Sequence, residues 1–209
     1  MVEPSDAPIA VDGTEPAHER IGVFGGTFDP VHVGHVCAAA ETRAALALDR
    51  VLLVVAGDPW QKHGVVVASA ADRLAMVRAA CVGIDGVEAS ALEVERAGPS
   101  YTVDTLRALE GRRRELFLMV GADVPPRLDT WHEPGAISAL ATLVVVERAG
   151  ELGGPPPGSG WRVERVPVTR VDAASSTLRT RLAAGGPVDG LVPPAVVRLI
   201  RERRLYTSA

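Results

Sequence analysis

Two histidines stand close together after a glycine turn near the start of the chain. His32 and His35 are separated by two residues, and they follow the run Gly25-Gly26-Thr27-Phe28. Glycines let a backbone pass close to a ligand, and a helix beginning just beyond them points N–H groups at an anion. Gly34, between the histidines, leaves no Cβ where a phosphate would approach. The pattern therefore predicts a phosphate site formed by the turn, with two imidazoles beside the anion.

Two common phosphate-binding motifs are excluded at this turn. A Walker loop requires Gly-x-x-x-x-Gly-Lys followed by Ser or Thr, and no lysine follows Gly34. A dinucleotide fingerprint requires Gly-x-Gly-x-x-Gly, whereas Gly22, Gly25 and Gly26 have a different spacing. What remains is a glycine turn followed by His-x-Gly-His.

A second candidate anion site lies near the C-terminus. Ser175, Ser176 and Thr177 precede a predicted helix that carries Arg179 in its first turns. Hydroxyls and unsatisfied backbone N–H groups would then gather at one helix N-terminus. A planar guanidinium is a suitable clamp for phosphate oxygens. The alternative interpretation is a helix N-cap followed by a solvated arginine.

Trp131 and His132 form a candidate site for a flat ring. Aromatic residues make up 4% of the chain, so few tryptophans are available for such a role. An indole can stack on a pyridinium ring through apolar contact and cation–π attraction. The alternative is a tryptophan that packs on the core. Asp123, which follows Gly121 after a predicted strand, could accept from a hydroxyl of the ligand, or else cap the next turn.

Lys62 and Asp29 are single charged residues near the predicted phosphate site. Lys62 lies in a loop that also holds Trp60 and His63. A lone loop lysine is usually solvated, but the position of this loop favours phosphate binding. Asp29 could be a magnesium ligand, yet Asp-Pro beside a glycine turn is a common turn former. We therefore expect a structural role for Asp29 and no metal held by the protein itself.

Short apolar runs alternate with helical ones along the chain. Strands are expected at Ile21–Phe24, Val51–Val55, Glu115–Val120 and Thr142–Val146, and more weakly at Val87–Ser90 and Val163–Val168. Helices are expected at Gly34–Leu48, Ala70–Cys81, Thr102–Glu110, Pro134–Leu140 and Pro194–Arg204. This alternation predicts an α/β fold, a doubly wound parallel sheet with right-handed crossovers. A ligand would lie across the carboxyl ends of the strands, where the residues following the first, second and fourth strands converge.

Composition bounds the kind of protein. With 209 residues, 47% of them hydrophobic, the chain can form a sizeable core, and we expect one domain over residues 20–206 after a disordered acidic leader, 1–19. The net charge of −4 gives no reason to propose a nucleic-acid partner. No apolar run is long enough to cross a membrane, so we expect a cytoplasmic protein. Cys37 and Cys81 lie in apolar helical contexts and are expected to be reduced.

Motifs along the chain resemble those of one family, the nicotinate-nucleotide adenylyltransferases of the nucleotidylyltransferase superfamily. The first is the Gly-Thr-Phe-Asp-Pro…His-x-Gly-His signature at residues 25–35. The others are at residues 58–63, 98–106, 121–123, 131–132, 175–179, 191–193 and 205–206. The resemblance covers roughly residues 20 to 206. One departure is Glu147-Arg148-Ala149-Gly150, where an Arg-Pro-Gly turn is expected; it leaves one pocket edge and any homo-oligomer contact open.

The resemblance implies a reaction and a fold. The enzyme would join the phosphate of nicotinate mononucleotide to the α-phosphate of ATP, giving nicotinate adenine dinucleotide and pyrophosphate, a step of NAD biosynthesis. Mg²⁺ would arrive with ATP, held mainly by phosphate oxygens. The fold would be Rossmann-like, with a small C-terminal helical segment. Because a phosphate is already the nucleophile, the chemistry needs charge-stabilising donors and no catalytic base.

Site residues follow from the motifs. The catalytic donors would be His32, His35, Lys62 and Arg179. ATP would contact Gly25, Gly26, Thr27, Phe28, Gly34, Gly121, Asp123, Ser175, Ser176 and Thr177, with the motif at Ser175 and Arg179 serving the β- and γ-phosphates. The resemblance stacks Trp131 on the nicotinate ring, while Thr102 and the backbone near His132 receive its carboxylate. Tyr101 and His132 are also expected to bind this substrate.

Two other hypotheses remain open. The same reaction could use another acceptor, such as nicotinamide mononucleotide, phosphopantetheine or a cytidylyl acceptor, because the histidine signature is shared among these enzymes. A non-catalytic nucleotide-binding module would keep the ATP pocket and release no pyrophosphate.

Overall fold

A computed structural model describes residues 18–59, 66–148, 150 and 153–207. Its strands are β1 (Glu19–Gly26), β2 (Arg50–Val55), β3 (Val87–Ser90), β4 (Arg114–Gly121), β5 (Ala141–Arg148) and β6 (Val163–Val168). Its helices are α1 (Val33–Ala45), α2 (Ala70–Cys81), α3 (Thr102–Leu109), α4 (Pro134–Leu140), α5 (Ser175–Ala183) and α6 (Pro194–Glu202), with a 3₁₀ helix η2 (Pro125–Thr130). Most of the predicted leader lies outside the described residues.

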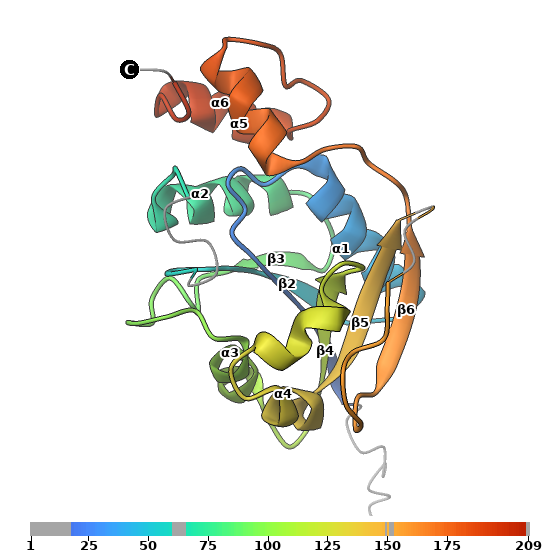
Figure 1. Cartoon of the computed structure of the whole chain (residues 1–209). Coiled ribbons are helices and arrows are strands. Elements are labelled where there is room, and N and C mark those ends of the chain that lie inside the picture. The colour runs from blue at the N-terminus through green and yellow to red at the C-terminus, as the bar shows by residue number, and fades with distance from the viewer. Residues whose placement is uncertain (1–17, 60–65, 149, 151–152, 208–209) are drawn as a thin grey trace, which may run out of the picture.

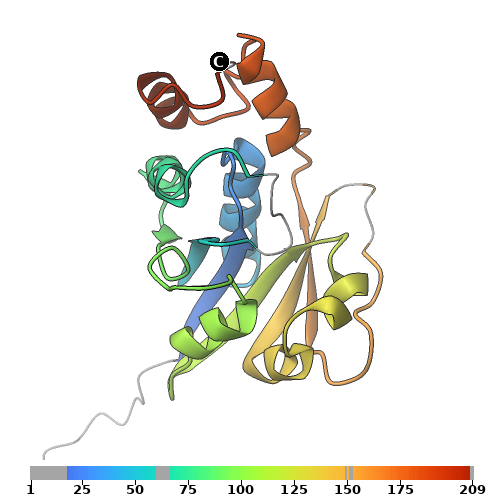
Figure 2. The same ribbon diagram turned by 60° about the vertical axis from the view of Figure 1, so that its left-hand side comes forward.

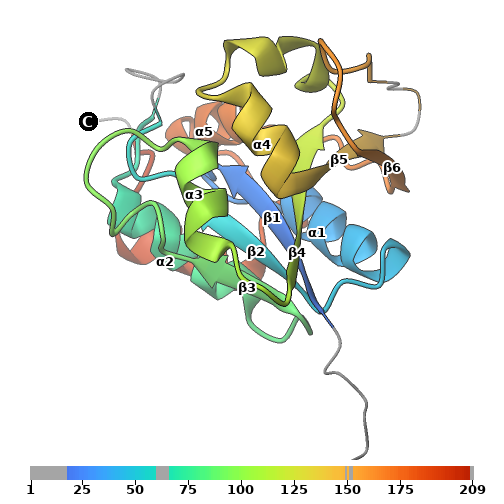
Figure 3. The same ribbon diagram turned by 90° about the horizontal axis from the view of Figure 1, so that it is seen from below.

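The strands form a parallel sheet covered by helices on both faces. The sheet has six strands in the order β3-β2-β1-β4-β5-β6. Helices α1 and α2 lie over one face, and α3 and α4 lie over the other (Figures 1 and 3). The predicted α/β doubly wound parallel sheet is confirmed.

The continuous apolar runs arise because each face of the sheet is buried. Along β2, Leu53 and Val55 join the core that includes α1, α2 and α6, while Leu52 and Val54 join the core beneath α3 and α4. Successive side chains of a strand point to opposite faces, so a strand covered on both sides must be apolar throughout. That is why short Val- and Leu-rich runs predicted the strands.

Several element boundaries differ from the prediction, and one element is new. The first strand continues through Gly25 and Gly26, which pair in register with Val54 and Val55 of β2. The helix α5 begins at Ser175, with Ala174 as its N-cap, so the Ser-Ser-Thr run forms the first turn instead of preceding it. The 3₁₀ helix η2 was not predicted; two prolines at its start suit a helix N-terminus.

The strand order places a crevice between β1 and β4. From β1 the chain builds the sheet in one direction, through β2 and β3. It then returns to the other side of β1, where β4, β5 and β6 extend the sheet in the opposite direction. Such a reversal leaves an opening at the carboxyl ends of the two central strands. Gly26 ends β1 and Gly121 ends β4, so the predicted convergence of these motifs is confirmed.

The C-terminal helices extend the α1 and α2 side of the molecule. Helices α5 and α6 lie beyond α1 and α2, away from the sheet (Figures 1 and 2). The core beneath them includes Leu178 from α5, Val196 and Ile200 from α6, and the buried Tyr206. The expected C-terminal helical segment therefore packs on the same side as the histidine-bearing helix α1.

Candidate active site

Two cavities meet at the carboxyl ends of β1 and β4. The larger has a volume of about 300 Å³ and the smaller about 70 Å³. Phe24, Gly121 and Asp123 line both of them. The larger cavity also contains Gly25, Thr27, Thr102, Trp131 and His132, and the smaller contains Gly34, His35 and Arg148. A ligand in one cavity would therefore lie next to a ligand in the other.

The two histidines stack on each other at the N-terminus of α1. His32 is the N-cap of the helix, and its ring lies 3.7 Å from the His35 ring, centroid to centroid, at an interplanar angle of 28°. The His32 backbone N–H donates to His35 Nδ1 at 3.3 Å. Because Nδ1 of His35 accepts this hydrogen bond, the proton of a neutral His35 ring is assigned to Nε2. His35 thus presents an N–H from the ring edge opposite its backbone contact.

His32 is a buried neutral imidazole. The residue is only 3% exposed. Burial is the main cause that lowers the pKa of its imidazole from 6.5 to about 4, and the positive charge of Arg148 is the second cause. Within the described part of the chain, His32 Nδ1 has no hydrogen-bond partner. Buried polar atoms are normally satisfied, so this ring nitrogen, which faces Gly34 at the edge of the smaller cavity, is a candidate ligand contact.

Two backbone N–H groups at the start of α1 have partners within the protein. The Val33 N–H donates to the carbonyl of Leu191 at 2.9 Å, and the His35 N–H donates to the carbonyl of His32 at 3.0 Å. These donors are already used within the protein. The imidazoles of the motif are therefore better placed as anion donors than the first-turn amides.

The glycines of the motif make room for rings. A Cβ on Gly26 would lie 2.7 Å from Phe28 Cζ, and one on Gly34 would lie 3.1 Å from His32 Nδ1. Only Gly25, among these three, would direct a Cβ into open space. Gly34 was expected to clear the path of a phosphate, but packing against His32 is a sufficient reason for it.

Phe28 is placed behind the histidines. It is 3% exposed, has a φ of +51°, and makes an edge contact with the His35 ring at 5.0 Å between centroids. Phe28 was predicted to contact ATP; in the structure its buried ring supports His35. Thr27, the neighbouring assignment, does line the larger cavity.

Helix α5 is tied to the loop that follows β1. The Ser175 hydroxyl donates to the carbonyl of Pro30 at 2.9 Å. Arg179 Nη1 donates to the carbonyl of Asp29 at 2.7 Å and lies 3.7 Å from its Oδ2 atom. Ser176 and Thr177 are exposed in the first turn. The structure thus brings the second motif beside the first, although Ser175 contacts a protein carbonyl and does not cap the helix.

Asp29 has the expected structural role. It is 2% exposed, and its carboxylate accepts from the backbone N–H groups of Val67 and Ala68 at 2.8 and 3.1 Å and from the Tyr206 hydroxyl at 2.7 Å. Both oxygens are engaged in these contacts. Lys62, Trp60 and His63 lie outside the described residues.

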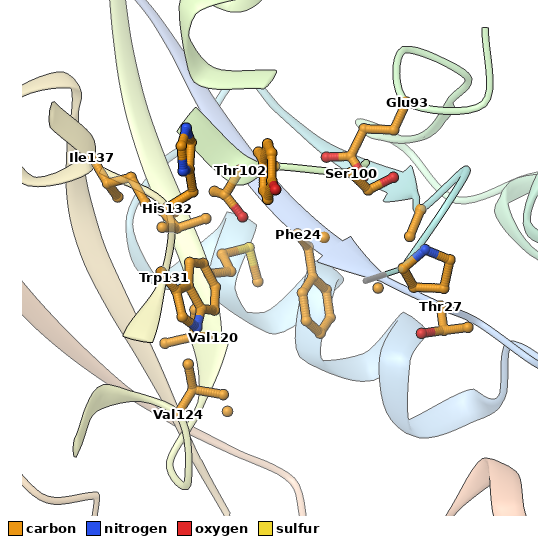
Figure 4. A pocket seen from close by; sticks show the side chains of 18 of the residues that line it. Phe24, Thr27, Glu93, Ser100, Thr102, Val120, Val124, Trp131, His132 and Ile137 are labelled. Atoms are coloured by element: carbon orange, nitrogen blue, oxygen red, sulfur yellow. The ribbon is translucent and has the colours of Figure 1, made fainter. Parts of the chain in front are cut away.

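Aromatic and polar side chains form the wall opposite β1. Trp131 lies across the larger cavity from Phe24, with His132 and Thr102 beside it (Figure 4). Tyr101 stacks on His132 with centroids 4.3 Å apart and an interplanar angle of 22°. Trp131 also packs on the core beneath α3 and α4. Tyr101, Thr102, Trp131 and His132 are therefore brought together as predicted, and Thr102 begins α3.

Asp123 occupies the junction between the cavities. It forms an exposed ion pair with Arg127 at 3.1 Å. A Cβ on Gly121 would lie 2.9 Å from Asp123 Oδ1, so the glycine allows the carboxylate to fold over the end of β4.

Two further residues at the cavities were not assigned from the sequence. Arg148 ends β5 and lines the smaller cavity; its place at the carboxyl end of a strand is the signal that would have identified it. Glu93 is 7% exposed, lines the larger cavity and accepts from the Thr105 hydroxyl at 2.5 Å. Burial raises the pKa of the Glu93 carboxyl. No local pattern marks Glu93.

The described residues contain no cluster of three or more histidine, cysteine, aspartate or glutamate residues that could hold a metal ion. Among them there is also no helix with the length and apolar character to cross a membrane.

Comparison with known proteins identifies the class. The sequence profile of the cytidylyltransferase-like family matches residues 23–181. A protein of Corynebacterium kroppenstedtii named as a probable nicotinate-nucleotide adenylyltransferase is 40% identical over 201 residues, covering 92% of this chain and 93% of its own. One of Roseiflexus sp. with the same name is 42% identical over 193 residues, covering 89% and 97%. This chain belongs to the nicotinate-nucleotide adenylyltransferase family, within the cytidylyltransferase-like class.

A solved structure supports the fold. The Plasmodium falciparum nicotinic acid mononucleotide adenylyltransferase complexed with NaAD superposes with a TM-score of 0.73 at 15% identity, covering 90% of this chain and 98% of that one. This match concerns the fold alone; the family resemblance inferred from the motifs is confirmed by the sequence relatives.

Proposed function

We propose that the protein transfers the adenylyl group of ATP to nicotinate mononucleotide, releasing pyrophosphate and forming nicotinate adenine dinucleotide for NAD biosynthesis. The observation that carries this proposal is the pair of cavities that meet at Phe24, Gly121 and Asp123, with His35 beside the junction. Two nucleotides bound side by side would meet there. The names of the relatives specify the reaction of this class.

The acceptor phosphate attacks the α-phosphate in line, and pyrophosphate leaves. Because the attacking group is already anionic, the protein must hold two anions together and stabilise spreading negative charge. His35, with its proton on Nε2, and the buried His32 are the donors at the point of transfer. Arg179, fixed by the carbonyl of Asp29, and Arg148 supply positive charge on the ATP side. We retain Lys62 as a further candidate cation.

The larger cavity suits a nicotinate ring. Trp131 offers an indole face for stacking, and the ring of Phe24 closes the opposite side. The first turn of α3, at Thr102, would face the carboxylate of the ring, since a helix N-terminus favours an anion over a neutral amide. An acceptor that carries a carboxylate is therefore preferred over nicotinamide mononucleotide.

We further propose that Mg²⁺ arrives on the phosphates of ATP. The donor chemistry of the described residues fits this arrangement, because both Asp29 oxygens already accept protein hydrogen bonds. Phosphate oxygens and water would complete the coordination of the ion, which neutralises charge on the leaving pyrophosphate when bound. Because ATP is the donor, we place the reaction in the cytoplasm.

Pyrophosphate release tests the proposal. ATP and Mg²⁺ are offered with nicotinate mononucleotide, nicotinamide mononucleotide or phosphopantetheine in separate reactions, and the dinucleotide products are identified by mass. We expect the highest kcat/KM with nicotinate mononucleotide. Turnover only with another acceptor would reassign the larger cavity, and no turnover with any of them would favour a nucleotide-binding module.

A further inference from the structure

One arginine outside the described machinery is almost completely buried. Arg73, in the first turns of α2, is 1% exposed and is among the largest fully buried side chains of the described residues. Burying a guanidinium is costly unless its N–H groups are hydrogen-bonded and its charge is compensated. Burial lowers the pKa of Arg73, and the charge of Asp29 acts in the opposite direction. A buried cation in this position calls for an explanation from its contacts.

Each nitrogen of the guanidinium donates to a different backbone carbonyl. Nη1 donates to Thr27 at 2.8 Å, Nη2 to Gly57 at 3.3 Å and Nε to Ala68 at 3.2 Å. Thr27 belongs to the glycine turn after β1. Gly57 and Ala68 are the two ends of the segment that joins β2 to α2. One side chain therefore connects three separate backbone positions.

One of these positions, Thr27, lines the larger cavity. A second, Gly57, lies between two residues that line it, Ala56 and Pro59. The start of the segment is also fixed by Ser100, whose hydroxyl oxygen accepts from the Gly57 and Asp58 N–H groups at 2.9 and 3.2 Å. Its end is fixed by the Asp29 carboxylate through Val67 and Ala68. Arg73 spans the space between these two anchors.

From this geometry we propose that Arg73 is a positioning residue that sets the separation between the Thr27 turn and the Gly57–Pro59 wall of the acceptor cavity. It acts through these carbonyls and does not line either cavity. The inference rests on the proposed adenylyl transfer. A planar fork of donors is required, because the single ammonium of lysine cannot reach three carbonyls arranged around it.

The test compares Arg73→Lys with wild type and with Arg78→Lys, a matched substitution on the exposed part of the same helix. For Arg73→Lys we expect kcat/KM for nicotinate mononucleotide to fall about 10- to 100-fold, as a displaced wall requires. The KM for ATP should change less than about threefold, and Arg78→Lys should match wild type. A thermal unfolding curve of each variant gives its Tm and the fraction that is folded at the assay temperature, and the rates are corrected by that fraction.

Chemical rescue provides a second readout that a purely structural role would not move. In Arg73→Ala, methylguanidinium at concentrations below those that denature should restore kcat/KM at least tenfold, and it should not affect wild type. If Arg73→Ala does not fold, Arg73→Lys decides alone. Arg73→Lys with kcat/KM within threefold of wild type, or a loss fully explained by its folded fraction, would overturn the proposal. Wild type that turns over no acceptor would instead contradict the proposed function.

Discussion

At the scale of single residues, the histidine pair divides its work. His35 presents Nε2–H because its Nδ1 accepts a backbone N–H, whereas His32 is a buried neutral imidazole stacked against it. The stacked arrangement keeps both rings in one orientation, with Phe28 behind His35. The stacking and the Phe28 contact therefore hold the two rings in one fixed orientation.

The first prediction concerns His35. Replacing it in His35→Ala removes a donor to the transferring phosphate, and kcat should fall about 10² to 10³-fold. The fold should remain, because the ring is a surface of the cavity and not a core side chain. Steady-state pyrophosphate release measures the effect, and His18→Ala, at an exposed position, serves as the control. A kcat within threefold of wild type would remove His35 from the transfer step.

His32 predicts a pH dependence of stability. Its folded pKa of about 4 lies below the unfolded value of 6.5, so the unfolded chain binds more protons between these values. The free energy of unfolding should therefore fall as pH decreases from 6.5 through 4, by roughly 3 kcal/mol for this group. Arg148 and the stacked His35 are the charged and titratable neighbours in this region.

Urea denaturation at pH 7, 6, 5 and 4 measures this contribution. His32→Gln cannot take up the proton, so its stability should depend less steeply on pH than that of wild type over this window. Parallel curves for the two proteins would show that His32 is not the group responsible.

At the scale of elements, strand β1 carries two adjacent glycines with different tasks. Gly26 has no Cβ where the Phe28 ring lies, so it makes room for that ring. A Cβ on Gly25 would instead point into open space at the larger cavity. Gly26→Ala should therefore displace Phe28, destabilise the protein by about 1 to 3 kcal/mol and lower kcat through His35. Gly25→Ala should leave stability unchanged and raise the KM for the acceptor.

The two variants act as controls for each other in denaturation and steady-state assays. Equal effects of Gly25→Ala and Gly26→Ala on stability would contradict the distinction drawn between the two positions.

Much of this element level could be predicted from the sequence. Strands buried on both faces appear as continuous apolar runs, and the glycine turn, Gly121 and Trp131 converge because parallel strands end at one edge. The start of α5 could not be predicted. Ser175 is a residue type that favours capping, but its hydroxyl contacts Pro30, which is 145 positions away in the chain. The role of Arg73 was missed for a similar reason. Its three partners are backbone carbonyls, which every residue type carries, so no sequence pattern marks them.

At the scale of the whole molecule, the C-terminus is joined to the first motif. The Tyr206 hydroxyl donates to Asp29 Oδ1 at 2.7 Å, and burial, then the hydrogen bond to Asp29, raises the pKa of the phenol. The contact links positions 177 residues apart. Asp29 in turn holds Arg179 and the end of the Gly57–Ala68 segment. The predicted site therefore depends on packing between the two ends of the described chain.

Tyr206→Phe tests this dependence. The substitution leaves a buried carboxylate oxygen with one donor fewer, and the free energy of unfolding should fall by about 1 to 3 kcal/mol. Thr207→Ala, which removes an exposed hydrogen bond to Arg204 nearby, should have little effect. Urea denaturation distinguishes the two, and an unchanged stability of Tyr206→Phe would show that the contact is not needed.

The same contact has a consequence for how the protein is made. A ribosome adds about 5 to 20 residues per second, so Asp29 is synthesised roughly 10 to 35 seconds before Tyr206. During that interval the nascent chain already contains both histidines of the motif, yet its aspartate lacks the phenol that completes its hydrogen bonding in the folded protein. Full assembly of the phosphate site therefore waits for the turn that follows α6, and a prematurely terminated chain would carry the signature without its final support.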